Sequence, residues 1–387
     1  MMKDKVLLWL RGGVANHLVN YPTPLNINYF WSFGSLTGLL LGVQIATGLA
    51  LAMNYTAHID HAFDSVEHIM RDVQYGWLLR YMHSNGASMI FFVLYSHMAR
   101  GIYYQSYKNP RTHVWMSGSL IFILMIGTIF LGYVLPFGQM SLWGITVITN
   151  IISIIPIFGQ HLVIWVWGGF AVGGATLTRF YGLHFLLPFV IAALAVLHLL
   201  ILHRTGSSNP VGVDSSLDQI KFFPYFFLKD TLIFLSFMAF FIYVVCYEPN
   251  AFGHPDNYIK ANPMVTPTHI VPEWYFLPYY AILKSIPSKI GGAIAMGLSM
   301  ACLFILPSLD FSKRSWVNAK FLWDFVFASI ILDVMLLGWL GGKIPSAVFV
   351  ILNQFLTFYY FFWFFVLIPA LSWFENNAIT KWIYNER

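Results

Sequence analysis

The stretch RYMHSNGASMIFFVLYSHMARG, residues 80–101, has the apolar character of a membrane span but contains two histidines, His83 and His97. Ionisable side chains are costly in hydrocarbon and usually serve a function there. The two histidines lie 14 residues apart, which in an α-helix is about 1400° of rotation, about 40° short of four turns, and about 21 Å along the axis. Both side chains are therefore expected to face nearly the same way, at two depths of one helix.

The composition is that of an integral membrane protein. Of 387 residues, 58% are hydrophobic and 10% are charged, whereas soluble domains contain about 25% charged residues. The net charge of +5 comes from scattered basic residues, so no nucleic-acid partner is predicted. The two cysteines, Cys246 and Cys302, belong to no CxxC or CxxCH motif, which argues against a zinc site or a covalently attached haem.

Eight apolar runs are long enough to cross a bilayer by the ~20-residue criterion, so the predicted fold class is an all-α polytopic membrane protein. The runs are about 32–53, 77–104, 114–134, 175–203, 227–247, 290–309, 321–341 and 348–372. Residues 135–174 are predicted to form one or two helices in the membrane interface. The proline-rich loop 248–289 is long enough to suggest a function.

The distribution of Lys and Arg predicts the orientation of the spans. If the N-terminus is placed on the inner side, 14 of the 21 Lys and Arg residues fall on that side. Both termini are therefore predicted inside, and the segments 135–174 and 248–289 outside.

A second apolar stretch, RFYGLHFLLPFVIAALAVLHLLILHR at residues 179–204, repeats the 14-residue step with His184 and His198. One expected span separates the two histidine helices, so they cross the membrane in the same direction. His83 is thus expected to meet His184 near the outer side, and His97 to meet His198 nearer the inner side. Facing imidazoles of this kind suit bis-histidine ligation of haem iron.

The neighbouring helices carry glycines at the same 14-residue step, and these would leave room for a flat macrocycle at two levels. The glycines are Gly34 and Gly48 in the first span and Gly118 and Gly132 in the third. Arg80 and Arg100, at the two ends of the second span, are candidates to pair with haem propionates.

Other interpretations of these residues stay open. A buried histidine is often a hydrogen-bonded packing residue, and glycine is a common close-packing device in membrane helices. Intramembrane histidines also serve in proton relays, which would not need the matching glycines. The alternative classes of protein are a haem-bearing anchor for a dehydrogenase and a haem-free transporter or proton channel. The four coincident steps favour a protein with two haems.

Six stretches carry a resemblance to a known family: FGSLTGLLLGVQIATGLALAMNY, RDVQYGWLLRYMHSNGAS, GYVLPFGQMSLWGITVITN, ATLTRFYGLHFLLPF, HRTGSSNPVG and PEWYFLPYYAILKSIP. Together they resemble cytochrome b of the ubiquinol–cytochrome c reductase complex, respiratory complex III, of the mitochondrial type. The resemblance covers about Trp31 to Trp373. It implies two non-covalent haem b groups, with iron ligands His83 and His184 in the outer haem and His97 and His198 in the inner haem.

The resemblance also implies a domain organisation and a setting. Residues 1–31 would be an N-terminal segment on the inner side, 32–210 a four-helix haem-binding bundle, and 211–387 a C-terminal four-helix domain that contains the loop 248–289. Expected partners are the Rieske iron–sulfur protein, a cytochrome c1 type subunit, other complex III subunits and the lipid membrane, in a dimeric complex. The expected location is the mitochondrial inner membrane, with both termini on the matrix side.

In this family ubiquinol is oxidised at an outer site. The oxidation releases protons, and Glu273 in the PEWY stretch is placed to accept one. Tyr275 beside it would pack on a quinone ring, and Pro272, Tyr133 and Gly144 are further candidates for lining that site. The alternative is that Glu273 only caps a short helix in the loop.

The family also reduces ubiquinone at an inner site. Quinone reduction takes up protons, so His203 and Asp230 are chemically apt there. Further candidates for the inner pocket are Ser207, Lys229, Trp31 and Ser35. The alternative is that His203 and Asp230 are only solvated polar groups at helix ends. The predicted function is that of the electron-transfer subunit that links the two sites through the haems, coupled to proton translocation.

Overall fold

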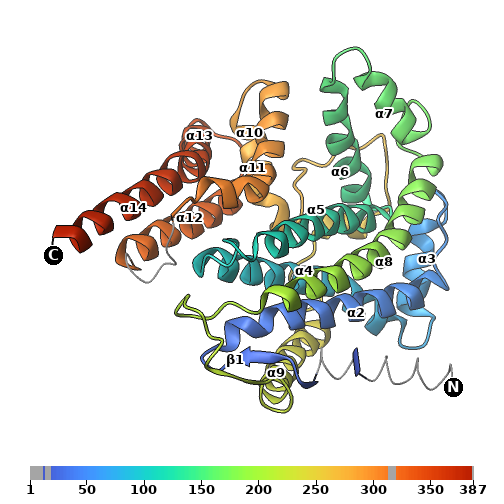
Figure 1. The fold of residues 1–387 in the computed structure, drawn as a ribbon. Coiled ribbons are helices and arrows are strands. Elements are labelled where there is room, and N and C mark those ends of the chain that lie inside the picture. Colours follow the sequence, from blue (N-terminus) through green and yellow to red (C-terminus); the bar gives the residue numbers. More distant parts are fainter. Residues whose placement is uncertain (1–11, 14–18, 313–319, 386–387) are drawn as a thin grey trace.

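The computed structural model describes residues 12–13, 19–312 and 320–385, and most of the regular structure in these ranges is helical (Figure 1). The α-helices are α2 (Phe33–Ala52), α3 (Ala62–Arg71), α4 (Gly76–Tyr103), α5 (Thr112–Val134), α6 (Gln139–Asn150), α7 (Gly159–Trp167), α8 (Gly174–Thr205), α9 (Tyr225–Tyr247), α10 (Leu277–Ser285), α11 (Lys289–Leu309), α12 (Lys320–Gly341), α13 (Ala347–Phe362) and α14 (Ile368–Asn385). Short 3-10 helices are η2 (Tyr29–Ser32), η3 (Ile151–Ile154), η4 (Pro255–Tyr258) and η5 (Trp274–Phe276), and a π-helical turn, η7 (Trp363–Leu367), joins α13 to α14.

Seven helices within the described residues are long and apolar enough to cross a membrane, and each matches a predicted span. They are Tyr29–Ala52, Thr112–Val134, Gly174–Thr205, Tyr225–Tyr247, Lys289–Leu309, Leu322–Gly341 and Ala347–Asn377. The predicted all-α polytopic fold class is thereby confirmed.

The remaining predicted span, about 77–104, is α4. Its 28 residues make a helix about 42 Å long, which exceeds the ~30 Å hydrocarbon thickness. Arg80, His83, Asn85 and Arg100 make α4 more polar than the other spans. Asn85 is buried and donates hydrogen bonds to the carbonyl groups of Tyr81 and Pro249, so part of this polarity is satisfied inside the protein.

The histidine-bearing helices each pack along one glycine-bearing helix. The most extensive contacts join α2 to α4 and α5 to α8, and these four helices lie alongside one another in Figure 1. Helix α9 packs against α4 and α2, while α10, α12 and α13 pack together on the other side. The fifth span thus contacts the first helices of the bundle.

One hydrophobic core runs through both halves of the chain. It extends from Leu36 in α2 and Phe91 in α4 to Trp363 in η7. Phe91 stacks on Tyr275 with ring centroids 4.5 Å apart and an interplanar angle of 4°. The PEWY segment is therefore held directly against the histidine helix α4.

The segment 135–174 is fastened to the proline-rich loop by hydrogen bonds. The Gln139 backbone N–H donates to the Ile259 carbonyl at 2.9 Å, and the Ser141 backbone N–H donates to Asn257 Oδ1 at 2.9 Å. The loop 248–289 contains η4, η5 and α10, so it is more regular than its prolines suggested. These contacts hold the start of α6 against residues 257–259 of the loop.

On the opposite side of the bundle, strands β1 (Pro22–Pro24) and β2 (Gln219–Lys221) pair antiparallel, with Thr23 opposite Ile220. This small sheet joins the segment before α2 to the connection between α8 and α9. It brings residues from both segments to the end of α8, where His203 lies.

Candidate functional site

The outer histidine pair has the geometry of two ligands around one metal. The rings of His83 and His184 lie with centroids 6.1 Å apart and planes at 88°. A metal bonded at about 2 Å to one nitrogen of each ring needs centroids roughly 6 Å apart. His184 Nδ1 lies 2.7 Å from the Thr128 carbonyl oxygen, which accepts its proton. Nε2 is then unprotonated, and its lone pair is available to bind a metal.

His83 is anchored in the same way. Its Nδ1 lies 3.0 Å from Thr47 Oγ1, and Thr47 donates its own proton to the Val43 carbonyl at 2.7 Å. The hydroxyl therefore accepts the Nδ1 proton of His83. This fixes the tautomer and leaves Nε2 unprotonated and able to bind a metal, as hydrogen bonds to the other ring nitrogen do in metal-bound histidines.

The inner pair is anchored by different groups. His198 Nδ1 lies 2.8 Å from Ser117 Oγ, and Ser117 donates to the Val114 carbonyl, so the arrangement repeats that of His83. His97 differs, because its Nδ1 lies 3.2 Å from an amino nitrogen of Arg100. A guanidinium only donates, so this contact places the proton of His97 on Nε2.

Arg100 has the character of an anion-binding residue. Its Nε is buried and has no hydrogen-bond partner among the described residues, and its guanidinium lies 5.0 Å from the centre of the Trp31 ring. A carboxylate from a cofactor would satisfy Nε and compete with His97 for the guanidinium, which would free the His97 tautomer needed for ligation. Arg80 lines the outer cavity together with His83 and His184.

Each predicted glycine lies against one of the four histidines. A Cβ placed on the glycine would come close to Cε1 of the facing ring: 2.9 Å for Gly34 and His97, 3.0 Å for Gly48 and His83, 3.1 Å for Gly118 and His198, and 2.5 Å for Gly132 and His184. By contrast, a Cβ placed on Gly38 or Gly42, which also belong to α2, would meet no atom within 4 Å. The 14-residue glycine step therefore leaves space for the histidine rings at two levels.

A cavity of about 530 Å³ surrounds the outer histidine pair and is also lined by Gly48, Gly132 and Arg80. Its volume is within the range of cofactor pockets, about 300–1,000 Å³. At the outer level the two anchored imidazoles, the opposed glycines and the cavity fit a haem. At the inner level the anchored His198, the opposed glycines and the unpaired nitrogen of Arg100 fit the same group.

Glu273 lies between this cavity and a second one of about 210 Å³. It occupies the N-cap position of η5, but its side chain makes no capping hydrogen bond, so the helix-cap alternative does not explain it. Burial raises the pKa of Glu273 to about 7, an effect partly opposed by the nearby Tyr133 hydroxyl. A carboxyl group with that pKa can both accept and release a proton near neutral pH.

The second cavity brings the predicted outer-site residues together. It is lined by Pro272, Glu273, Tyr275, Tyr133 and Gly144, which come from α5, α6 and the PEWY segment. The sequence did not predict the other lining residues, which include Ile270, Tyr279 and Met296. Tyr279 belongs to the same conspicuous motif, but nothing in the sequence indicated that α11 would supply Met296.

The inner-site candidates lie in several separate contacts near the ends of α2, α8 and α9. Ser35 Oγ donates to Asp230 Oδ2 at 2.7 Å, so these two candidates meet. Lys229 Nζ donates to the Ile27 carbonyl at 2.7 Å. Trp31 packs on Tyr104, with ring centroids 4.7 Å apart. Tyr104 was not predicted for this site.

His203 stacks on Tyr21 with ring centroids 4.1 Å apart. Ser207 accepts a hydrogen bond at its carbonyl from Arg111 at 3.0 Å. Neither Tyr21 nor Arg111 was predicted, because each comes from a segment remote in sequence and belongs to no recognisable motif. Burial raises the pKa of Tyr21 despite the nearby charge of Arg111.

Comparison with known proteins gives consistent matches along the chain. The family model described as Cytochrome b/b6/petB matches residues 18–206, and Cytochrome b(C-terminal)/b6/petD matches residues 260–361. Proteins named Cytochrome b are similar to most of this chain. The Chondrus crispus protein is 54% identical over 94% of this chain and 95% of its own length. The Marchantia polymorpha protein is 55% identical over 94% of this chain and 90% of its own length. The Rickettsia bellii protein is 53% identical over 93% of this chain and 90% of its own length.

A solved structure titled Hyperthermophilic respiratory Complex III contains a chain with the same fold. The TM-score is 0.89 at 35% identity, and the match covers 95% of this chain and 97% of that one.

Proposed function

The chain belongs to the cytochrome b family and is an electron-transfer subunit of respiratory quinol–cytochrome c reductase, and on that premise we propose that it carries a quinol-oxidising and a quinone-reducing site. The observation that carries this proposal is the pair of histidine levels on α4 and α8, each facing glycines of α2 and α5. A haem-free transporter would have no need of that arrangement.

His83 and His184 would hold the outer haem iron, and His97 and His198 the inner one. Arg80 and Arg100 would bind carboxylates of the cofactors. When bound, two b haems supply one-electron carriers at two depths of the membrane. The anchored Nδ1 atoms of His83, His184 and His198 keep the ligand nitrogens directed inward.

At the outer site, oxidation of a quinol to a quinone releases two electrons and two protons. We assign one proton to the Glu273 carboxylate, whose place between the two cavities lets it receive the proton on one side and release it on the other. Tyr275 and Pro272 would pack against the ring, and Tyr133 would hold the Glu273 side chain. The apolar walls of the smaller cavity suit a quinone and its lipid tail.

At the inner site, reduction of a quinone consumes two electrons and two protons. Asp230, which Ser35 holds by a hydrogen bond, and His203, which lies on Tyr21, are the proposed donors. Ser207, Lys229 and Trp31 would shape the pocket. A charge that crosses the membrane in this process stores about 2.3 kcal/mol per 100 mV.

The rest of the expected setting belongs to the same proposal. It includes a Rieske iron–sulfur protein and a cytochrome c1 type subunit as partners, further complex III subunits and a dimeric complex in the mitochondrial inner membrane. Residues 1–31, 32–210 and 211–387 are the proposed parts, with both termini on the matrix side.

The test compares His83→Ala with His68→Ala in the assembled complex. His68 is exposed on α3 and pairs with Asp72 at 2.8 Å, so it is a control for histidine loss itself. His83→Ala should lose one of two haems per chain and the quinol-dependent reduction of cytochrome c, while His68→Ala retains both. A colourless wild-type protein, or full haem content in His83→Ala, would refute the proposal.

A further inference from the structure

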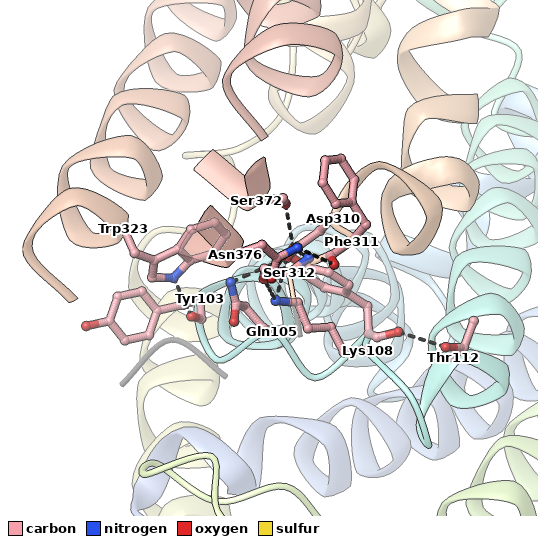
Figure 2. Close-up of polar contacts among 11 residues, drawn as sticks. Tyr103, Gln105, Lys108, Thr112, Asp310, Phe311, Ser312, Trp323, Ser372 and Asn376 are labelled. Atoms are coloured by element: carbon pink, nitrogen blue, oxygen red, sulfur yellow. Dashed lines mark hydrogen bonds and ion pairs between the residues drawn. The ribbon is translucent and has the colours of Figure 1, made fainter. Parts of the chain in front are cut away.

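The buried carboxylate of Asp310, at the end of α11, is contacted by five side chains (Figure 2). Its side chain is 3% exposed. Oδ2 accepts from the Tyr107 hydroxyl at 2.6 Å and from Gln105 Nε2 at 3.3 Å, and it forms an ion pair with Lys108 Nζ at 3.0 Å. All three partners belong to the connection between α4 and α5, residues 104–111.

The other carboxylate oxygen faces the C-terminal helices. Oδ1 accepts from Ser312 Oγ at 2.8 Å and from Ser372 Oγ of α14 at 2.9 Å. Figure 2 shows these side chains converging on one point from the chain around 105–112, the end of α11 and α14. Charge-assisted hydrogen bonds from several segments to one carboxylate hold those segments in one geometry.

The connection 104–111 has a backbone that needs such support. Gln105 has φ of 49° although it is not glycine, and it is 5% exposed. Left-handed backbone at a buried non-glycine residue costs free energy and persists only where the surroundings impose it. The hydrogen bond from Gln105 to Asp310 is one such constraint.

The connection 104–111 also makes hydrogen bonds to the residues that follow α8. Arg111 Nε donates to the Gly206 carbonyl at 2.8 Å, and its amino group donates to the Ser207 carbonyl at 3.0 Å. The hydroxyls of Ser106 and Ser208 lie 2.9 Å apart. Three contacts thus tie residues 206–208 to a connection whose middle is held by Asp310.

These contacts reach the inner-site candidates. His203 belongs to the last turn of α8 and stacks on Tyr21, and the charge of Arg111 acts on the Tyr21 hydroxyl. Tyr104, the first residue of the connection, packs on Trp31. A shift of residues 104–111 would therefore move groups on two sides of the inner pocket.

We propose that Asp310 is a positioning residue for the inner quinone site: it holds the connection 104–111, which in turn places the end of α8 with His203 and Ser207. This inference rests on the proposed inner site. It predicts that weakening the Asp310 cluster impairs binding of quinone at the inner site selectively, because the side chains described above as bonded to the Asp310 carboxylate do not line the outer cavities.

The experiment uses the assembled complex with Asp310→Asn, Tyr107→Phe and the control Asp64→Asn. Asp64 forms an exposed ion pair with Lys260 at 2.8 Å on the other side of the fold, so it controls for loss of a carboxylate–lysine pair. Haem reduction by quinol is followed through the inner site with the outer site inhibited, and through the outer site with the inner site inhibited. Quinol concentration and pH are varied, and haem content is measured by absorption.

We expect Asp310→Asn to raise the inner-site KM for quinol about tenfold, since small misplacements of positioning groups have effects of at least this size. Tyr107→Phe should raise it about threefold, as for loss of one hydrogen bond. Outer-site kinetics, haem content and Asp64→Asn should match wild type. Asp310→Asn also removes the ion pair with Lys108, so Tyr107→Phe decides the outcome if the first variant fails to assemble.

An assembled Tyr107→Phe complex with the wild-type inner-site KM and pH profile would overturn the inference. Equal impairment of both sites would also overturn it, because that result indicates only a general structural role. If wild-type complex shows no quinol-driven haem reduction through the inner site, the proposed function itself fails, and this outcome is distinct from the failure of Asp310 to act on it.

Discussion

Of the four glycine-to-alanine substitutions, Gly132→Ala should weaken haem binding most, and it should do so at the outer level. The new Cβ would lie 2.5 Å from His184 Cε1, whereas ordinary contacts begin at about 3.4 Å. The ring would have to retreat by about 0.9 Å, and it is held by its hydrogen bond to the Thr128 carbonyl. Overpacking of this kind costs about 1–3 kcal/mol, which corresponds to about a 5- to 140-fold loss of haem affinity.

The assay is titration of haem into the apo complex, or the haem content of purified protein, followed by the absorption bands of the two b haems. The matched control is Gly42→Ala in α2, where the added methyl group meets nothing within 4 Å. Alanine favours a helix over glycine by about 1 kcal/mol, so the control should be neutral or stabilising. Wild-type affinity for both haems in Gly132→Ala would refute the account of the glycines as space for the ligand rings.

Three further predictions concern the haem level and the two quinone sites. His198→Ala should remove the inner haem band and leave the outer one; loss of neither band would exclude His198 as a ligand. Glu273→Gln should slow quinol oxidation about 100-fold while both bands persist. Because burial raises the pKa of Glu273 to about 7, its proton-accepting carboxylate form grows as pH rises through 7, so the wild-type rate should rise there and the variant should lose that dependence. An unaltered pH profile would remove Glu273 from the chemistry. Asp230→Asn should slow quinone reduction at the inner site about tenfold or more, measured with the outer site inhibited, and Ser35→Ala should have a smaller effect; equal rates in all three proteins would rule out this pair as the proton donor.

The position of Glu273 connects the two cavities described above. Its backbone begins η5, and the Trp274 indole donates to Ser88 Oγ at 3.0 Å while Tyr275 stacks on Phe91. The PEWY segment is thus attached to α4 through its aromatic residues, and the carboxyl group of Glu273 lines both cavities, the proposed haem level and the proposed quinone site. A proton and an electron that leave the same quinol would therefore separate within one small region of the protein.

Much of the candidate site could be predicted from the sequence because its determinants are local. Helix geometry alone places His83 and His97 on one face at two depths, and the same period places Gly118 and Gly132 on a matching face. Hydrophobicity identified the spans, although α4 is the least apolar of them because it carries Arg80, Asn85 and Arg100 besides its two histidines. The PEWY motif identified the outer loop, but sequence could not separate a helix cap from a proton acceptor at Glu273.

The features that could be read from the sequence were therefore periodic: eight apolar segments, and two histidine pairs and two glycine pairs with one common step, each a property of a single helix. Tertiary structure decided which glycine faces which histidine, that Glu273 is buried between two cavities, and that Tyr21 lies on His203. It also decided that Asp310 meets Tyr107, 203 residues away along the chain. These contacts depend on how separate helices pack, and packing is a property of the whole folded chain that no local period specifies.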